Sequence, residues 1–455
     1  MRKFIITSIT ISALLLGTYS CSEDPATDEL SDSTEQNDNN SEVPEDENED
    51  ENNDDQTSSS GVTTLDLVPE FPEVDGYPTF EINPTIVENS NLQVNVVEIF
   101  GAKGDGETDD STALQSAIDL VAASSIGGIV YMPLGEYVLH DIYLKSNVHL
   151  HIEAGSTITM PASSSNTSLF LLGTDEFINN VVVRGVNGRF TIDLVGMTAK
   201  PRTFRLKSIH NFLISDIDFQ DYLIEFPMIG LGPDADQDPD IFGPTNGVIR
   251  NCSSYGGHYG YGLIQVQCAK QVYFENLYGE GGVVLRFETG EDSMNESQFG
   301  GVFDCRGQDI SGKNGNATVM ISPHAMQDGR VQVDGITAVS MGIGVRIDAG
   351  YDYTYTADDG TEITVPAGTY TEGAYISNIN CTFGTDAQVK TKHLKYMPEE
   401  LLDDVPDPYS GTICQPSPSV CAILYVPNYP LGILGDVVAT GYLNDAIVTE
   451  EAERS

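Results

Sequence analysis

Charged and polar side chains recur at alternate positions of several short apolar segments. Side chains of a strand point alternately to its two faces, so segments 204–207, 264–267, 283–288 and 345–348 turn their apolar residues inward. His324 follows a similar alternation and is expected near the end of its strand. Cations hold anionic groups and a carboxyl supplies acid chemistry, so this face is typical of a groove for an extended anionic polymer. The outward set consists of Arg205, Lys207, Gln265, Gln267, Arg286, Glu288, Arg346 and Asp348.

The overall charge of the chain makes this concentration of cations informative. The 455 residues include 21 Lys and Arg against 69 Asp and Glu, which gives a formal net charge of −48. Such an acidic protein is a poor partner for nucleic acid or for an anionic membrane, and it suits a salty environment in which charges are screened. The simpler alternative for the outward set is a solvated face with chance ion pairs.

Repeated segments indicate the fold that must position these side chains. Five segments carry apolar residues at alternate positions, together with Asn or Asp. They are 212–217, 247–252, 272–277, 331–336 and 375–379. The step from Asp216 to Asn251 is 35 residues and the step from Asn251 to Asn276 is 25, an irregular period typical of a solenoid with loop insertions. We predict an all-β protein, a right-handed parallel β-helix, in which Asn251, Asn276 and Asn378 form structural ladders between coils.

The folded body begins with a predicted capping helix. Residues 111–123 carry apolar side chains at helical spacing, and Asp109, Asp110 or Ser111 can cap this helix over the open end of the first coil. With the two strand-like runs that follow, this stretch resembles the N-terminal signature of pectin-active β-helix enzymes and their polysaccharide-degrading relatives. The resemblance implies the fold and leaves the reaction open.

The N-terminus predicts export and anchoring. A basic start, an apolar run over residues 4–16 and small residues before Cys21 resemble a bacterial lipoprotein signal with Cys21 as the lipidated residue. Residues 22–55 contain 16 acidic residues and no Lys or Arg, so we expect an extended tether. The predicted organisation is a signal over 1–21, an acidic linker over 22–68, a catalytic β-helix over 69–386 and a C-terminal capping region over 387–455. We expect a monomer anchored at the outer membrane and displayed on the cell surface, or secreted.

The C-terminal region has two interpretations. It either closes the end of the solenoid or folds over the groove. Cys414 and Cys421 lie close together in a Pro-rich stretch and could form a disulfide in an oxidising compartment. The cysteines in strand-like runs are expected to be buried thiols; these are Cys252, Cys268, Cys305 and Cys381.

Three polar residues carry a closer resemblance. Gln265, Glu288 and His324 are similar in order, spacing and strand setting to the active-site residues of glycoside hydrolase family 82, the ι-carrageenases, and the similarity covers residues 96–382. It implies that Glu288 is a general acid, that Gln265 helps to position a water or a bound ion, and that His324 contacts substrate or tunes the acid. It implies hydrolysis of a sulfated galactan with inversion and no required cofactor. A structural calcium, or a bound halide or sodium ion, is left open.

One departure from the family pattern concerns the catalytic base. The family has Asp two residues after the acid, where this chain has Gly290. Two residues along a strand separate side chains by about 7 Å, the spacing that admits a water between the acid and the base of an inverting enzyme. On such a strand, Gly290→Asp should preserve or raise the rate. Otherwise Glu291, Asp292 or Asp348 supplies the base, or Gln265 holds a water that another group activates.

Two other functions remain open at this point. A polygalacturonase or lyase acting on uronate polymers fits the N-terminal signature, and a lyase could use Arg286 or Lys207 as its base, often with calcium. The Asn-x-Asp and Asp-Asp arrangement of polygalacturonases is absent around Glu288 in the sequence. A surface glycan-binding protein that has lost its base is the non-catalytic alternative.

Overall fold

The computed structural model describes residues 61–67, 82–161, 167–197, 200–233, 242–408 and 411–450. The predicted signal segment with Cys21 lies outside these residues, as does most of the predicted linker. Strand β1 (Val62–Leu65) falls within the range predicted as linker and pairs with β2 (Ile86–Asn89), so ordered structure begins before residue 69. Within the described ranges, no helix is long and apolar enough to cross a membrane.

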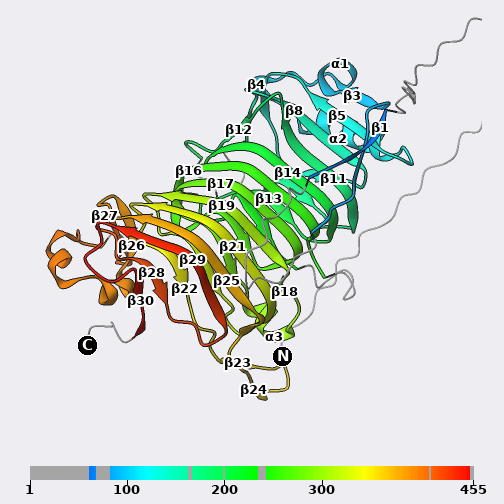
Figure 1. The fold of residues 1–455 in the computed structure, drawn as a ribbon. Coiled ribbons are helices and arrows are strands. Elements are labelled where there is room, and N and C mark those ends of the chain that lie inside the picture. The colour runs from blue at the N-terminus through cyan, green and yellow to red at the C-terminus, as the bar shows by residue number, and fades with distance from the viewer. Residues whose placement is uncertain are drawn as a thin grey trace, which may run out of the picture. The chain divides into compact units, whose positions relative to one another are not determined.

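Parallel strands stacked coil upon coil form the body of the protein (Figure 1). The row of strands that carries the outward polar residues is continuous, each strand pairing in parallel with the next. In order, this site-bearing row consists of β7 (Ile142–Leu144), β10 (Ser168–Leu172), β13 (Arg202–Leu206), β15 (Ile229–Leu231), the ends of β16 (Thr245–Val266) and β17 (Cys268–Glu288), β20 (Ala317–Ser322), β22 (Ile343–Ile347), β28 (Cys421–Tyr425) and β30 (Ile447–Val448).

The remaining parallel strands close each coil around a continuous apolar core. This arrangement confirms the predicted all-β parallel β-helix. A second row comprises β3 (Gln93–Asn95), β5 (Gly128–Met132), β8 (Val148–Glu153), β11 (Ile178–Val186), β14 (Ile209–Gln220), β16, β17, β19 (Cys305–Lys313), β21 (Gln327–Val339), β25 (Thr369–Thr382) and β29 (Leu431–Thr440). A shorter third row comprises β4 (Asp105–Asp109), β6 (Glu136–Val138), β9 (Thr157–Thr159) and β12 (Phe190–Asp193), and β18 (Gly301–Phe303) pairs with the start of β17.

Amide ladders fix the bends between coils, as the sequence predicted. The side-chain amide of Asn276 donates to Asn251 at 2.8 Å, and Asn251 donates to Asp216 at 3.1 Å. Asn378 donates to Asp334 at 2.7 Å. Asn251, Asn276 and Asn378 adopt φ values of 54°, 48° and 52°, a left-handed conformation that Asn tolerates. Their role is therefore structural.

The helix α2 (Ser111–Ala122) covers the first coil with the buried side chains of Leu114, Ala117, Ile118 and Val121. The carboxylate of Asp109 accepts a hydrogen bond from Ser111 N at 3.0 Å, so Asp109 caps the helix. Asp110 is the N-cap residue, but its side chain makes no cap hydrogen bond. The carboxylate accepts from Lys103 N at 2.6 Å and from Gly104 N at 2.9 Å, and so fixes the turn that follows the short helix α1 (Val96–Phe100).

The C-terminal region both closes the coil and flanks the groove. Strands β28, β29 and β30 continue the β-helix beyond the predicted boundary at residue 386. An excursion from the β-helix lies between β25 and β28 in the chain. In it, β26 (Ala387–Lys390) pairs antiparallel with β27 (Ile413–Ser417), and the 3-10 helices η1 (Thr391–Tyr396) and η2 (Glu399–Asp404) connect the two strands.

The predicted Cys414–Cys421 disulfide is wrong. Both thiols are free and buried, as are those of the other four described cysteines. Cys414 lies in the antiparallel β26–β27 pair, whereas Cys421 lies in the parallel stack on β28. The six residues that separate them lead from one sheet to another and do not bring the two sulfurs together.

Candidate active site

Two outward rows of side chains run across the coils of the site-bearing row. In the first, residues in register from coil to coil are Arg205, Gly230, Gln265, Arg286, Met320 and Arg346. In the second, Glu288 lies opposite Ser322 on the next coil. The predicted in-and-out alternation is thus correct. The short strand β15 lies between Arg205 and Gln265 and places Gly230 at the outward position.

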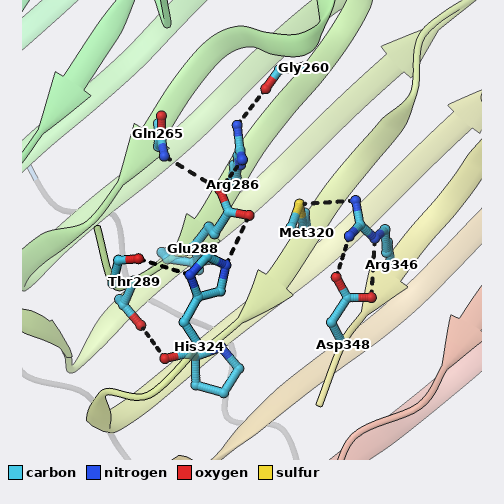
Figure 2. Close-up of polar contacts among 12 residues, drawn as sticks. Gly260, Gln265, Arg286, Glu288, Thr289, Met320, His324, Arg346 and Asp348 are labelled. Carbon is cyan, nitrogen blue, oxygen red and sulfur yellow. Dashed lines mark hydrogen bonds and ion pairs between the residues drawn. The ribbon is translucent and has the colours of Figure 1, made fainter. Parts of the chain in front are cut away.

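Glu288 lies where three polar side chains converge (Figure 2). The guanidinium of Arg286 pairs with its Oε2, and His324 Nε2 lies 3.2 Å from its Oε1. Gln265 Nε2 lies 3.5 Å from Oε2. The Glu288 side chain is 12% exposed, so it is shielded from bulk water but reachable from the outward face of the site-bearing row, which is called the groove below. The structure therefore brings together four of the predicted site residues.

The charge of Glu288 is set by these neighbours. Burial opposes its ionisation, but the hydrogen bond with His324 and the charges of Arg286, His324 and Arg346 outweigh burial and lower the pKa of the carboxyl to about 2. Burial also opposes the charge of His324. The hydrogen bond and charge of Glu288, with the Gly290 carbonyl, outweigh it and raise the pKa of the imidazole. Glu288 and His324 thus form an ion pair that holds one exchangeable proton.

His324 lies in a strained turn after β20. Its φ is 48°, and its ring lies 5.1 Å from the ring of Tyr351, centroid to centroid. Its Nδ1 lies 2.9 Å from the carbonyl oxygen of Gly290, which can only accept a hydrogen bond. A residue held in the left-handed region away from Asn or Gly marks a constrained site. The turn aims the imidazole at Glu288.

Arg346 and Asp348 form a separate pair in the same groove. Arg346 Nε donates to Asp348 Oδ1 at 3.1 Å, its Nη2 contacts Oδ2, and its Nη1 lies 3.6 Å from Met320 Sδ. Arg346 pairs with Met320, which pairs with Arg286, so the Arg346–Asp348 pair lies two coils from Arg286. Asp348 is neutralised by its own arginine and is not placed beside Glu288.

A cavity of about 360 Å³ opens on the other side of Glu288. Predicted residues line it, among them Arg205, Lys207, Gln265, Gln267 and Arg286. One wall of the cavity is aromatic and was not predicted: the centroids of the Phe226 and Tyr261 rings lie 6.1 Å apart, and Arg202 Cζ lies 3.8 Å from the Phe226 centroid. Glu291 also lines the cavity.

Lysines of the C-terminal region flank the groove on the Arg346 side. Gln388 anchors this segment to the β-helix, donating to Gly257 O at 3.0 Å and accepting from Gly282 N at 2.8 Å. Burial, then the charges of Arg346, Arg286 and Lys392, lower the pKa of Lys390 to about 8. Burial and Arg346 also lower the pKa of Lys392. The lysine cluster is visible in the sequence, but only the tertiary fold shows that it approaches the groove.

Gly290 does not occupy a strand position, which corrects the expectation about the base. Strand β17 ends at Glu288, and Gly290 has φ +100°. A Cβ there would lie 2.4 Å from Asn295 Oδ1 and 2.9 Å from His324 Cβ. An Asp at this position would strain the backbone and displace its neighbours. The premise that Gly290→Asp restores a strand-borne base is therefore wrong.

Comparison with known proteins agrees with the fold. The rhamnogalacturonase A/epimerase, pectate-lyase-like family matches residues 93–295. An iota-carrageenase of Alteromonas macleodii is 32% identical over 62% of this chain and 57% of its own length, and an iota-carrageenase of Zobellia galactanivorans is 36% identical over 56% and 53%. The chain spans just over half the length of these curated relatives.

The fold of one solved structure is similar to that of this protein over most of the chain. A 1,3-α-1,4-β-D-galactose-4-sulfate-3,6-anhydro-D-galactose-2-sulfate 4 galactohydrolase has a TM-score of 0.74 and 25% identity, over 86% of this chain and 96% of that chain. By sequence and by fold, the chain is a homologue of the family 82 ι-carrageenases within the right-handed β-helix superfamily.

Proposed function

We propose that the protein is a glycoside hydrolase that degrades a sulfated galactan, with ι-carrageenan as its substrate. The observation that carries the proposal is the enclosure of Glu288 by Gln265, Arg286 and His324 in a cationic groove. The names of the sequence relatives and of the similar solved structure support this substrate class. They do not favour a uronate lyase or a binding protein without activity.

Cations on both sides of Glu288 fit a repeating anionic polymer. Arg202, Arg205 and Lys207 line the cavity on one side. Arg346, Lys390 and Lys392 flank the other side, where burial and then the repulsion from Arg346 lower the pKa of both lysines. Sulfate esters bound between such cations relieve that repulsion, so the groove gains affinity from substrate charge.

Substrate binding also moves a proton from His324 to Glu288, where cleavage needs it. In the substrate-free protein the lowered pKa of Glu288 and the raised pKa of His324 favour a carboxylate next to a protonated imidazole. Sulfates that approach Arg286 and Arg346 weaken the hold of these cations on Glu288, and burial then favours its neutral form. His324 passes its proton to Glu288, which donates it to the glycosidic oxygen as general acid.

The proposed reaction inverts the anomeric centre, with Glu291 as the base. Glu291 lines the same cavity as Gln265 and Arg286, with its Oε1 accepting from Ser293 Oγ at 3.1 Å. Asp348 is paired with Arg346, and neither Asp348 nor Asp292 lines that cavity. The amide oxygen of Gln265 can hold the attacking water while Glu291 removes its proton. As proposed, side chains of this chain carry out both proton transfers.

We further propose that Cys21 anchors a monomer to the outer membrane, with the acidic segment as a tether. The sequence pattern supports this location. Labelling of growing cells with a radioactive fatty acid tests it: the wild-type protein should carry the label and Cys21→Ala should not. Label on the variant would disprove lipidation at Cys21.

Product analysis tests the proposed reaction. Purified protein is incubated with ι-carrageenan, with less sulfated galactans and with polygalacturonate, and reducing ends and ultraviolet absorbance are recorded. We expect new reducing ends from ι-carrageenan without the absorbance of an unsaturated sugar. Absorbing products would indicate a lyase, and binding without new reducing ends would indicate a glycan-binding protein.

A further inference from the structure

Asp328 is a carboxylate that lies wholly buried behind the groove. It lies on β21, with 0% of its surface exposed. Its Oδ2 accepts from Thr289 Oγ1 at 2.7 Å, and its Oδ1 accepts from Val302 N at 2.7 Å. Within the described ranges, no Lys, Arg or His lies within ion-pair distance of it. Burying a carboxylate without a paired cation destabilises the folded state, so a purely structural role does not account for Asp328.

The hydrogen bonds of Asp328 reach both members of the Glu288–His324 pair. Thr289 directly follows Glu288, and its backbone N donates to Ser322 O at 3.1 Å. Its Oγ1 also lies 3.1 Å from the carbonyl oxygen of Pro323, which directly precedes His324 (Figure 2). Thr289 thus lies between Asp328 and the two turns that carry the acid and the imidazole.

The single hydroxyl proton of Thr289 links these contacts to the charge of Asp328. When Asp328 is ionised, Thr289 donates to it and cannot donate to Pro323. When Asp328 is protonated, it can donate to Thr289, which then donates to Pro323. The two charge states of Asp328 therefore give two different hydrogen-bond arrangements around the turn of His324.

We infer that Asp328 is a positioning residue that, through Thr289, fixes the turns of Glu288 and His324 and keeps the proton on His324. The inference rests on the proposed function, because it concerns the same acid. Asp328 needs no contact with substrate for this role; a negative charge buried near His324 favours the imidazolium.

The surroundings of Asp328 are consistent with this role. Burial raises its pKa to about 7, against the hydrogen bonds from Thr289 and Val302 and the charge of His324. The other titratable groups that interact with Asp328 are neutral near pH 7, because burial raises the pKa of each. They are Cys268, Cys305, Tyr370 and Tyr429. His324 is therefore the charged group among those that interact with Asp328.

The isosteric variant Asp328→Asn tests the inference. Its amide oxygen can still accept from Val302 N, and its NH2 can donate to Thr289, so the fold should be kept while the charge is lost. We expect kcat to fall about tenfold with KM unchanged, and the alkaline limb of the kcat profile to move to lower pH. Asp221→Asn is the control, because Asp221 is also buried, with its pKa raised to about 8, but accepts from Ile224 N at 2.9 Å in another turn.

Direct titration of the His324 imidazole by NMR separates this inference from the proposed function. A lower His324 pKa in Asp328→Asn supports the inference even if the wild type does not cleave carrageenan. An unchanged pKa and an unchanged pH profile would overturn it. If Asp328→Asn does not fold, Thr289→Val replaces it and should reproduce the loss of kcat, while Thr289→Ser restores the hydroxyl and the rate. Equal rates in Thr289→Val and wild type would then refute the inference.

Discussion

The imidazole of His324 and the carboxylate of Glu288 form a hydrogen-bonded ion pair in the groove, with Nε2 3.2 Å from Oε1. The other ring nitrogen faces the Gly290 carbonyl oxygen at 2.9 Å, so both nitrogens meet acceptors and both carry hydrogen. The imidazole is therefore a cation in the resting protein. This arrangement holds a proton beside Glu288, the proposed general acid.

Glu288→Gln should abolish hydrolysis while keeping the fold. Glutamine preserves the shape of the side chain and can accept from Arg286, but it cannot donate a proton to the leaving group. We expect kcat to fall by about a thousandfold or more. Glu275→Gln lies on the same strand outside the site and serves as the control. Full activity in Glu288→Gln, measured by reducing ends, would eliminate the proposed acid.

His324→Gln should destabilise the protein most between pH 4.5 and 6.5. The raised pKa of His324 gives stability that is present below its ordinary value of 6.5 and is lost as pH rises through the folded value. The lowered pKa of Glu288 gives stability that is present above 4.5 and is lost as pH falls toward about 2. Both contributions coincide between these limits.

Denaturant unfolding of wild type and His324→Gln measures this window. The free energy of unfolding should differ by about 2 kcal/mol within it, because a charge-assisted hydrogen bond is removed. The difference should shrink in alkaline buffer, where the imidazolium deprotonates. A difference that does not vary with pH would show that packing, and not the ion pair, is responsible.

Glu291→Gln should lower kcat far more than Asp348→Asn does. Glu291 lines the cavity with Gln265 and Arg286, whereas Asp348 is held by Arg346. Loss of a general base costs about a hundredfold or more. Asp348→Asn should instead raise KM, because Arg346 loses its orienting partner. A larger kcat loss in Asp348→Asn would reverse the assignment of the base.

Arg205→Ala and Lys392→Ala should each raise KM for ι-carrageenan, by about tenfold at low salt, and the effect should shrink as salt is added. The two residues test the two sides of Glu288 separately. Lys313→Ala is the control, since Lys313 pairs with Glu280 at 3.3 Å outside the site-bearing row. Equal KM values for the variants and wild type would contradict sulfate binding at these positions.

Local periodicity made much of this structure predictable. The alternation around Glu288 and Arg286 shows which side chains face outward, and Asn at bends predicts the ladder from Asp216 to Asn276. Other features depend on the path of the chain. The short coil at β15 carries Gly230 at the outward position and leaves no polar signal.

The remaining features depend on contacts between distant segments. Lys390 reaches the groove because Gln388 bonds to Gly257 and Gly282, 131 and 106 residues away in the chain. Asp328 lies 39 residues from Thr289, and its burial is visible only once the coils are stacked. The left-handed turn at Gly290 has no signal beyond the glycine itself.

Gly290→Ala should lower activity even though it adds a single methyl group. The residue has φ +100°, and a Cβ would lie 2.4 Å from Asn295 Oδ1 and 2.9 Å from His324 Cβ, so the turn must shift and carry the imidazole away from Glu288. Gly360→Ala is the matched control: its φ is +85°, but no atom lies within 4 Å of the added Cβ. Both variants place a side chain on a residue with positive φ and so strain the backbone, but only Gly290→Ala also displaces His324. We expect kcat to fall at least about tenfold in Gly290→Ala and to stay near wild type in Gly360→Ala. Gly290→Asp, with a larger side chain in the same space, should be at least as impaired. Wild-type activity in Gly290→Asp would show that the turn can rearrange and that a carboxylate at this position can serve the reaction.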